Sequence, residues 1–547
     1  MAIELPARRL RELTANASPV LDSIAVPSFE RERESSALRP LAVRSLEIAT
    51  GALALILIST LIWGYVWFPT YIAVAVLIFD VYWLWKSWTV GYHALKGARL
   101  LRETASRDWI GDYLGAAARG QDVIAWDAVR HIVIIPNYKE SDAKLRSTLQ
   151  TLAKVNGARH SVIPVLAMEE AEAGSERRGR LLAKEFAPFF YEVLVAVHPA
   201  GLPGEIRGKS CNEDWAARRS VSELVGRRGL SLDNLTVTSC DADTQFHHQY
   251  FEALTFNFAT DENRYRRFWQ APIFFYNNIW QVPAPLRVPN AMSGLIHLGR
   301  LSRKRRVLFS QSTYSLSMRM AHDVGYWDTD IIPEDWHMFL KCFFELNGQV
   351  EVEPIYLPLG NDGALSTTPR ATYLNHYLQV RRWGWGASDL PYAAGQALNH
   401  PEIPLLRRLL RTWYFFENHL MWSTQWFFLT LGGMIPLSYW ALTGDTLSPS
   451  WFFPTNWTYF GFLPGFISLT SVVMTPTLVP FLILVVLDHR LRPPAPAGMS
   501  TRHRLLAHLA WLAISPITFF CSALPALDAQ VRLMLGKRME YRVTEKV

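Results

Sequence analysis

Two carboxylates stand one residue apart directly after a predicted strand in the middle of the chain. Asp241 and Asp243 follow residues 235–239, which have the pattern of a buried strand, so both side chains leave the strand end on the same side. Carboxylate oxygens at this spacing suit Mg²⁺ or Mn²⁺, and either cation would neutralise a diphosphate. A helix N-cap is the alternative interpretation, because Asp is common where a strand turns into a helix.

A second acidic pair lies further along the chain. Glu334 and Asp335 precede the apolar periodic run 338–346, which predicts a helix. A carboxylate at the start of a helix serves either as a cap or as a general base.

A third group combines an amide, a guanidinium and an indole. Gln379, Arg382 and Trp383 have the i, i+3 and i+4 spacing that places side chains on one face of a helix. Arg can hold phosphate oxygens through two hydrogen bonds, and Trp offers an apolar face on which a sugar ring packs. A salt-bridged helix surface is the alternative for this group.

Short apolar runs alternate with helical patterns around these residues. Residues 131–135, 161–168 and 235–239 predict strands, and a helical pattern after the first runs through residue 152. Polar residues follow the three runs: Tyr138, Glu140, Glu169, Glu170, Asp241 and Asp243. The alternation predicts a mostly parallel sheet, in which ligands bind at the carboxyl ends of the strands.

Composition indicates a chain that is part membrane protein and part polar domain. Of 547 residues, 50% are hydrophobic and 19% are charged, which is too apolar for a simple soluble enzyme and too polar for a membrane bundle alone. The net charge of +7 comes largely from basic residues beside apolar runs, so we expect membrane lipids and no nucleic acid as partners. The four cysteines have no CxxC spacing and no His partner pattern, so the sequence predicts neither a zinc site nor a disulfide framework.

Apolar runs at both ends of the chain predict transmembrane helices. Residues 48–68 and 71–85 read as a hairpin, and the basic residues outside both legs place its ends in the cytoplasm. Residues 413–442 and 459–487 read as a second pair of spans. Residues 505–535 are too short for two full spans, and we expect a re-entrant hairpin with the C-terminus inside.

Three ionisable residues lie within or beside these apolar runs: Asp80, Glu417 and His419. They predict either the lining of a polar path or groups at helix ends near the lipid headgroups.

Five short motifs occur in a fixed order between the predicted membrane segments. They are PxYxE after the first strand, Lys209 with Asn212, the DxD of Asp241 and Asp243, Glu334 with Asp335, and the QxxRW that ends at Trp383. Together they resemble the family 2 inverting glycosyltransferases, which include cellulose, hyaluronan and chitin synthases. The resemblance covers residues 130–383 and implies an α/β domain of the GT-A type inserted between transmembrane helices.

The resemblance also implies roles for the matching residues in the donor site. Tyr138 and Glu140 correspond to the turn that contacts the nucleoside, and Lys209 corresponds to the lysine that meets the diphosphate. Glu169 or Glu170 stands where the family usually has Asp, which leaves the contact to uracil open.

The remaining motif residues would hold metal, acceptor and reacting groups. Asp241 and Asp243 would bind Mg²⁺ or Mn²⁺, and Asp335 would be the general base. Asn212, Asp241 and Arg382 would contact the donor, and Glu334, Gln379 and Trp383 the acceptor. A tail similar to the gating loop of cellulose synthases contains Val543, Thr544 and Lys546, with an unstructured basic tail as the alternative.

The resulting hypothesis is a multi-pass inner or plasma membrane enzyme whose catalytic domain faces the cytoplasm. It would transfer a sugar with inversion from a nucleotide sugar, expected to be a UDP-sugar, to a growing β-glycan. The alternatives are a single-addition transferase acting on a membrane lipid, and a transporter or scaffold with a degenerate nucleotide-binding domain. The predicted units are an N-terminal tail, a transmembrane hairpin, the GT-A domain, interface helices, a C-terminal membrane region and a gating-like tail, over residues 1–43, 44–93, 94–370, 371–411, 412–536 and 537–547.

Overall fold

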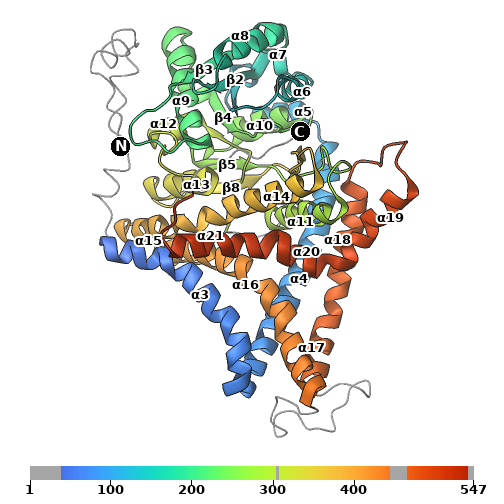
Figure 1. The fold of residues 1–547 in the computed structure, drawn as a ribbon. Coiled ribbons are helices and arrows are strands. Elements are labelled where there is room, and N and C mark those ends of the chain that lie inside the picture. The colour runs from blue at the N-terminus through green and yellow to red at the C-terminus, as the bar shows by residue number, and fades with distance from the viewer. Residues whose placement is uncertain (1–37, 304–306, 444–464, 540–547) are drawn as a thin grey trace.

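The computed structural model describes residues 38–303, 307–443 and 465–539. An α/β domain lies on one side of the molecule and a group of long helices converges away from it on the other (Figure 1). The strands are β1 Arg130–Pro136, β2 Val162–Glu169, β3 Leu194–His198, β4 Leu235–Ser239, β5 Arg267–Gln270, β6 Ile273–Phe274, β7 Tyr314–Ser317, β8 Glu351–Pro354 and β9 Leu359–Gly360.

Seven strands form one mixed sheet in the order β3-β2-β1-β4-β7-β5-β8. The first four strands are mutually parallel, and β7 runs antiparallel to both β4 and β5. The chain leaves β1 toward β2 on one side and returns to β4 on the other, so the strand order reverses between β1 and β4. Such a reversal opens a crevice at the carboxyl ends of the two strands, where open α/β sheets bind ligands.

The parallel strands are buried on both faces. Ile132 and Ile134 pack in one apolar cluster with residues of the helices over 209–221 and 334–345. Val133 and Ile135 pack in another cluster with residues of the helices over 142–152 and 250–260. This two-sided burial explains why apolar residues fill most positions of β1 and β2. The helices of this domain are α5 Trp109–Ala118, α6 Asp142–Leu152, α7 Ala158–Ser161, α8 Ser175–Phe186, α9 Lys209–Val221, α10 Tyr250–Thr260, α11 Ala284–Leu301, α12 Met318–Asp323 and α13 Glu334–Glu345.

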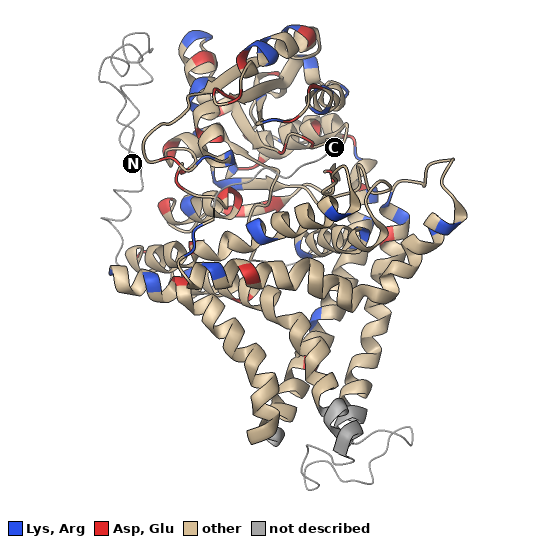
Figure 2. Ribbon diagram, viewed as in Figure 1, with Lys and Arg blue, Asp and Glu red and all other residues tan. Residues whose placement is uncertain are grey.

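The converging helices are long, and they carry few charged side chains away from the α/β domain (Figure 2). They are α3 Pro40–Trp67, α4 Pro69–Ala105, α16 Leu405–Thr443, α17 Gly465–Met474 and α18 Leu478–Leu491. Four segments of the described chain are long and apolar enough to cross a membrane: Pro40–Trp67, Tyr71–Ala105, Thr470–Leu491 and Thr501–Met534. The helices α3 and α4 cover the residues of the predicted hairpin, and α4 continues past the expected boundary at residue 93.

A layer of helices lies crosswise between the α/β domain and the converging helices (Figure 1). It contains α14 Pro369–Gly384, α15 Leu390–Asn399, α20 Ile514–Thr518 and α21 Leu524–Met534. A hairpin over residues 505–535 would pack its two legs against each other. In the structure the two ends of this segment instead pack on different helices: α19 Thr501–Leu509 packs on α11, and α21 packs on α14, α3 and α16. The helix α21 therefore supports α14, the helix that carries Gln379, Arg382 and Trp383, on the side away from the α/β domain (Figure 1).

Candidate active site

The carboxyl ends of β1, β2 and β4 face one cavity of about 1380 Å³. Most of the predicted site residues line it: Tyr138, Glu140, Glu169, Lys209, Asn212, Asp241, Asp243, Glu334, Asp335, Gln379, Arg382 and Trp383. Glu170 is not part of the lining, and its carboxylate instead accepts a hydrogen bond from the Ala200 amide at 2.9 Å. Val543, Thr544 and Lys546 lie outside the described residues. The motifs thus converge on one cavity, and their individual roles stay predictions.

Lys209 is the electrostatic centre of this cavity. Its Nζ lies 2.9 Å from Glu334 Oε1, 3.2 Å from Asp241 Oδ1 and 3.7 Å from Glu213 Oε1, and it donates a hydrogen bond to the Ser312 carbonyl at 2.9 Å. Burial alone would lower the pKa of Lys209, but the three carboxylates raise it well above its ordinary value. The ammonium group of Lys209 is therefore charged, and it lines the cavity where it can also contact an anionic ligand.

Loop residues outside every predicted motif hold the two carboxylates after β4. Asp241 Oδ2 accepts hydrogen bonds from Ser312 Oγ at 2.8 Å and from Asn361 Nδ2 at 3.2 Å. Asp243 Oδ2 accepts one from the Asp362 amide at 2.6 Å. Asn361 and Asp362 follow β9, whose pairing with β6 brings them to the end of β4. No motif marks these residues, because their position depends on loop geometry.

The oxygen donors in this corner fit a hard divalent cation. Asp241 and Asp243 both line the cavity, and carboxylate oxygens are the ligands that Mg²⁺ and Mn²⁺ prefer. The Lys209 ammonium contacts one oxygen of Asp241, and the Asn361 side-chain amide donates to the other. These contacts orient Asp241, as supporting groups commonly do around a metal ligand.

Asp335 is half-buried at the start of α13. Its Oδ2 accepts a hydrogen bond from the Ser312 amide at 2.9 Å, and its Oδ1 accepts one from the Trp336 amide at 2.9 Å. Burial and the neighbouring Glu334 carboxylate raise the pKa of Asp335 to about 7, against the opposing effect of Lys209. An Asp in water has a pKa of about 3.9, so the surroundings of Asp335 in the fold account for the raised pKa. A group that titrates near neutral pH is well matched to proton transfer.

A tight turn after β1 and the end of β2 form the opposite wall. Glu140 Oε2 accepts a hydrogen bond from the Tyr138 amide at 2.6 Å, and Lys139 between them has a positive φ of 68°. Glu140 thus shapes the turn that presents Tyr138. Glu169 at the end of β2 lines the cavity and contacts His198 of the neighbouring strand at 3.1 Å.

The helix α14 carries the QxxRW residues that line the cavity, and the later helix α21 holds it in place. Thr368 caps its start by accepting a hydrogen bond from the Ala371 amide, and Pro369 occupies the first turn, where a missing N–H does no harm. Arg381 Nη1 and the Tyr377 hydroxyl both contact Asp528 of α21, at 3.1 and 3.2 Å. These contacts orient the opposite face of α14, which bears Gln379, Arg382 and Trp383.

A buried charge network stands behind Asp335. His337 Nε2 lies 2.8 Å from Asp328 Oδ2, and His337 Nδ1 lies 3.2 Å from Asp389 Oδ2. Lys341 also pairs with Asp328. Burial would lower the pKa of His337, but Asp389 and Asp328 raise it well above its ordinary value. The network joins α13 to the 3₁₀ turn Trp385–Asp389 that follows α14, and sequence spacing did not indicate it.

The cavity extends from Asp241, Asp243 and Asp335 into the space between the long helices. Its far part is lined by aromatic and apolar side chains of α4, α16, α18 and the segment after α19, including Trp83, Trp422, Trp426, Phe481 and Trp511. Of the three ionisable residues noted in the apolar runs, only His419 lines the cavity. Glu417 instead pairs with Lys86 at 3.2 Å, and Asp80 is buried away from the lining.

The geometry therefore combines a buried cation, two carboxylates at a strand end and a third carboxylate that titrates near neutral pH. Residues 236–486 match the family model of glycosyl transferase family group 2. The family 2 match begins in β4 and ends in α18, so it contains the DxD, the acidic pair and QxxRW but not Tyr138 or Lys209. It covers somewhat less than half of the chain. Over this region the chain is similar to the nucleotide-sugar transferases of family 2, and the predicted GT-A-like α/β fold is confirmed.

Solved structures that resemble the chain are also glycosyltransferases. One is the mannosyltransferase PcManGT from Pyrobaculum calidifontis in complex with GDP-Man and Mn²⁺, with 13% identity, 82% of this chain and 100% of that chain covered, and a TM-score of 0.40. Another is GalNAc-T7 with UDP, GalNAc and Mn²⁺, with 14% identity, 59% of each chain covered and a TM-score of 0.28. No curated protein matches the chain.

Proposed function

We propose that this protein is a membrane-embedded, inverting glycosyltransferase that extends a β-glycan from a nucleotide-sugar donor. The observation that supports this proposal most directly is the single cavity that joins the carboxylates at the strand ends to an aromatic path among the helices. Its volume of about 1380 Å³ exceeds the roughly 300–1,000 Å³ of an ordinary small-molecule site. The extra space suits a donor and an extended acceptor bound together.

In the proposed reaction Asp335 takes the proton from an acceptor hydroxyl, which then attacks the anomeric carbon of the donor sugar. The bond from that carbon to the diphosphate breaks at the same time, so an α-linked donor gives a β-glycoside. Lys209 and Arg382 stabilise the negative charge that develops on the departing nucleoside diphosphate. A Mg²⁺ or Mn²⁺ ion bound by Asp241 and Asp243 would supply further charge neutralisation.

The donor would lie along the carboxyl ends of β1, β2 and β4. Tyr138 and Glu169 line the cavity just after β1 and at the end of β2, and a nucleobase such as uracil would fit between them. Asn212 is tied by a 2.9 Å hydrogen bond to the Ala167 carbonyl of β2, so it links the two walls of this part. Glu334, Gln379 and Trp383 would hold the acceptor end near Asp335.

The preference for a polymer over a single addition rests on the aromatic lining. Flat indole faces pack on sugar rings, and Trp83, Trp422, Trp426 and Trp511 place four of them along the part of the cavity between the long helices. A lipid acceptor whose chain lies in the same apolar space is the second candidate. In either case the α/β domain would face the cytoplasm, where nucleotide sugars are made, and the long helices would cross the inner or plasma membrane.

A donor panel with product sizing tests the proposal. The detergent-solubilised full chain is incubated with UDP- and GDP-sugars and Mg²⁺ or Mn²⁺, and both nucleoside diphosphate release and product length are measured. We expect metal-dependent release with one donor and products longer than one added sugar. Products with a single sugar on a lipid would favour the second candidate, and no release with any donor would refute both.

A further inference from the structure

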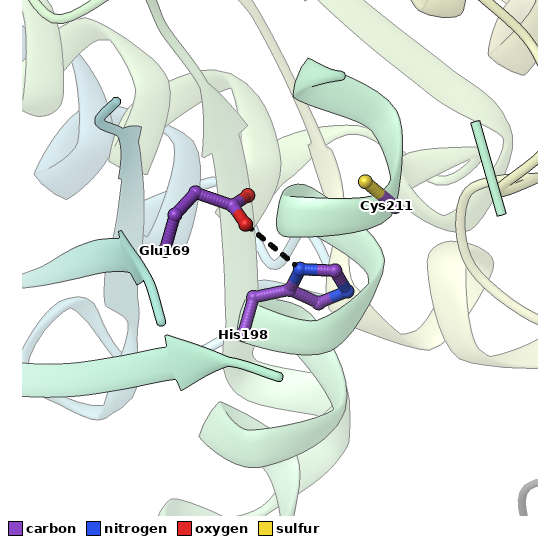
Figure 3. A group of neighbouring side chains, drawn as sticks. All are labelled: Glu169, His198 and Cys211. Carbon is purple, nitrogen blue, oxygen red and sulfur yellow. Dashed lines mark hydrogen bonds and ion pairs between the residues drawn. The ribbon is translucent and has the colours of Figure 1, made fainter. Parts of the chain in front are cut away.

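Three potential metal ligands of different chemistry meet at one end of the sheet. Glu169 ends β2, His198 ends β3, and Cys211 lies in the first turn of α9 (Figure 3). One ligand atom from each residue lies within 4.8 Å of the others, and all three residues are buried. The Glu169 carboxylate and His198 Nδ1 already approach to 3.1 Å. Ligands of a tetrahedral zinc ion lie about 3.3–3.8 Å apart, so small side-chain movements would accommodate one.

A fourth residue fixes the orientation of the imidazole. Glu205 Oε2 lies 2.9 Å from His198 Nε2, on the side of the ring opposite Glu169. Histidines that bind metals commonly donate their second ring N–H to a carboxylate, which fixes the tautomer and makes the other nitrogen a better ligand. Glu205 lies near enough to take this role after a small reorientation, and Nδ1 contacts Glu169 at 3.1 Å.

We propose that Glu169, His198 and Cys211 form a binding site for one zinc-class cation, with Glu205 as the supporting carboxylate. A thiolate and an imidazole select Zn²⁺ or Co²⁺ over Mg²⁺ and Mn²⁺, which prefer oxygen ligands alone. The site is therefore chemically distinct from the carboxylate pair Asp241 and Asp243. It does not depend on the proposed glycosyltransferase reaction.

The ligands come from three separate segments, which is why cysteine spacing along the sequence predicted no zinc site. Burial raises the pKa of the Cys211 thiol to about 12, and the two carboxylates raise that of His198 to about 9 despite its burial. In the metal-free protein the thiol is protonated and the imidazolium bridges the carboxylates. Binding forms one bond each from the metal to the Cys211 sulfur, the His198 Nδ1 and a Glu169 oxygen, and it releases the thiol proton and the Nδ1 proton to solvent.

A bound cation would fasten the ends of β2 and β3 to the start of α9. Lys209 begins the same helix two residues before Cys211, and Asn212 follows Cys211 directly. The site would therefore fix the position of Lys209 relative to the sheet, and it would occupy Glu169 on the wall of the cavity.

Cobalt absorption of the full chain tests this proposal without relying on any variant. The purified protein is stripped of metal with a chelator and titrated with Co²⁺. We expect a thiolate-to-cobalt charge-transfer band in the near ultraviolet that saturates at one equivalent and disappears on addition of Zn²⁺. Cobalt bound at the carboxylate pair has no sulfur ligand and gives no such band. Absence of the band at saturating Co²⁺ would overturn the proposal.

Variants then identify the ligands. Cys211→Ser should abolish the band, and His198→Gln should weaken Zn²⁺ binding by at least about 100-fold. Glu205→Gln should weaken Zn²⁺ binding about 10- to 100-fold, as loss of a supporting carboxylate does. The matched controls are Cys342→Ala, which removes another buried cysteine, and Asp243→Ala, which removes the hard-metal site. Both controls should keep the band, and a band that survives in Cys211→Ser would refute the ligand assignment.

Discussion

Lys209 Nζ lies 2.9 Å from Glu334 Oε1 and so joins the start of α9 to the start of α13. The contact balances a buried charge before any ligand binds, because Glu213 and Asp241 approach the same ammonium group. An incoming diphosphate would share this cation. Lys209 would then exchange carboxylate oxygens for phosphate oxygens. Because Glu334 is one of those carboxylates, donor binding would be coupled to Glu334 and Asp335 on α13.

Replacement of Lys209 by Met should therefore weaken donor binding. A hydrogen bond to a charged group contributes about 1.5–3 kcal/mol, so we expect the Kd for the nucleotide sugar to rise roughly 10- to 100-fold. Titration calorimetry with the nucleoside diphosphate measures this. Lys154→Met, at an exposed position, is the matched control and should bind as the unmodified protein does. Equal affinity in both variants would contradict the role of Lys209.

Asp335→Asn should separate chemistry from binding. The amide keeps the shape of the side chain but cannot accept a proton, so we expect transfer to fall by roughly 10²- to 10⁴-fold while nucleotide affinity changes little. Sugar transfer and nucleotide binding are measured on the same detergent preparation. The exposed Asp323→Asn serves as control. Turnover retained in Asp335→Asn would show that another group is the base.

The raised pKa of Asp335 predicts the pH dependence of the reaction. A base must be ionised, and burial with the Glu334 charge raises the pKa of Asp335 to about 7, so kcat/KM should rise with pH up to about 7 and level off above it. Below that pKa the rate should fall about tenfold per pH unit. Glu334→Gln removes a neighbouring negative charge and should shift the rise to lower pH. A rise that is unchanged in Glu334→Gln would contradict the stated cause.

The convergence of the motifs could be predicted from local sequence because each motif sits at the end of a regular element. Asp241 and Asp243 follow a strand that is buried at every position, and Gln379, Arg382 and Trp383 have helical spacing. Periodicity fixes which way such side chains point, and the parallel sheet brings the strand ends together.

The supporting residues could not be predicted, because their positions depend on loops and on packing between distant segments. Ser312 and Asn361 contact Asp241, and the Ser312 amide also contacts Asp335, yet no pattern in the chain distinguishes either residue from an ordinary loop residue. The raised pKa of Asp335 has the same origin, since burial is a property of the folded domain. The position of α21 beside α14 was missed because hydrophobicity indicates membrane contact but not helix direction.

His337 should contribute strongly to stability. It lies buried between Asp328 and Asp389, and removing one partner of a buried charge network costs about 3–5 kcal/mol because the other charges stay desolvated. We expect His337→Gln to lower the thermal unfolding midpoint clearly. His322→Gln, at an exposed position, is the control and should leave the midpoint nearly unchanged. Similar midpoints for both variants would show that the buried network is not stabilising.

Gly384 ends α14 where that helix crosses α21. A methyl group at this position should displace the face of α14 that bears Gln379, Arg382 and Trp383. An added Cβ would lie 2.9 Å from the Cα of Ala526, a backbone atom that cannot turn away. In an open helix Gly→Ala stabilises by up to about 1 kcal/mol, but overpacking costs about 1–3 kcal/mol and reverses the sign. Gly433→Ala in α16 is the matched control, because its Cβ would meet no atom within 4 Å. We expect Gly384→Ala to raise the KM for acceptor and lower the unfolding midpoint, and Gly433→Ala to do neither. If the two variants behave alike, α21 does not set the position of Arg382 and Trp383.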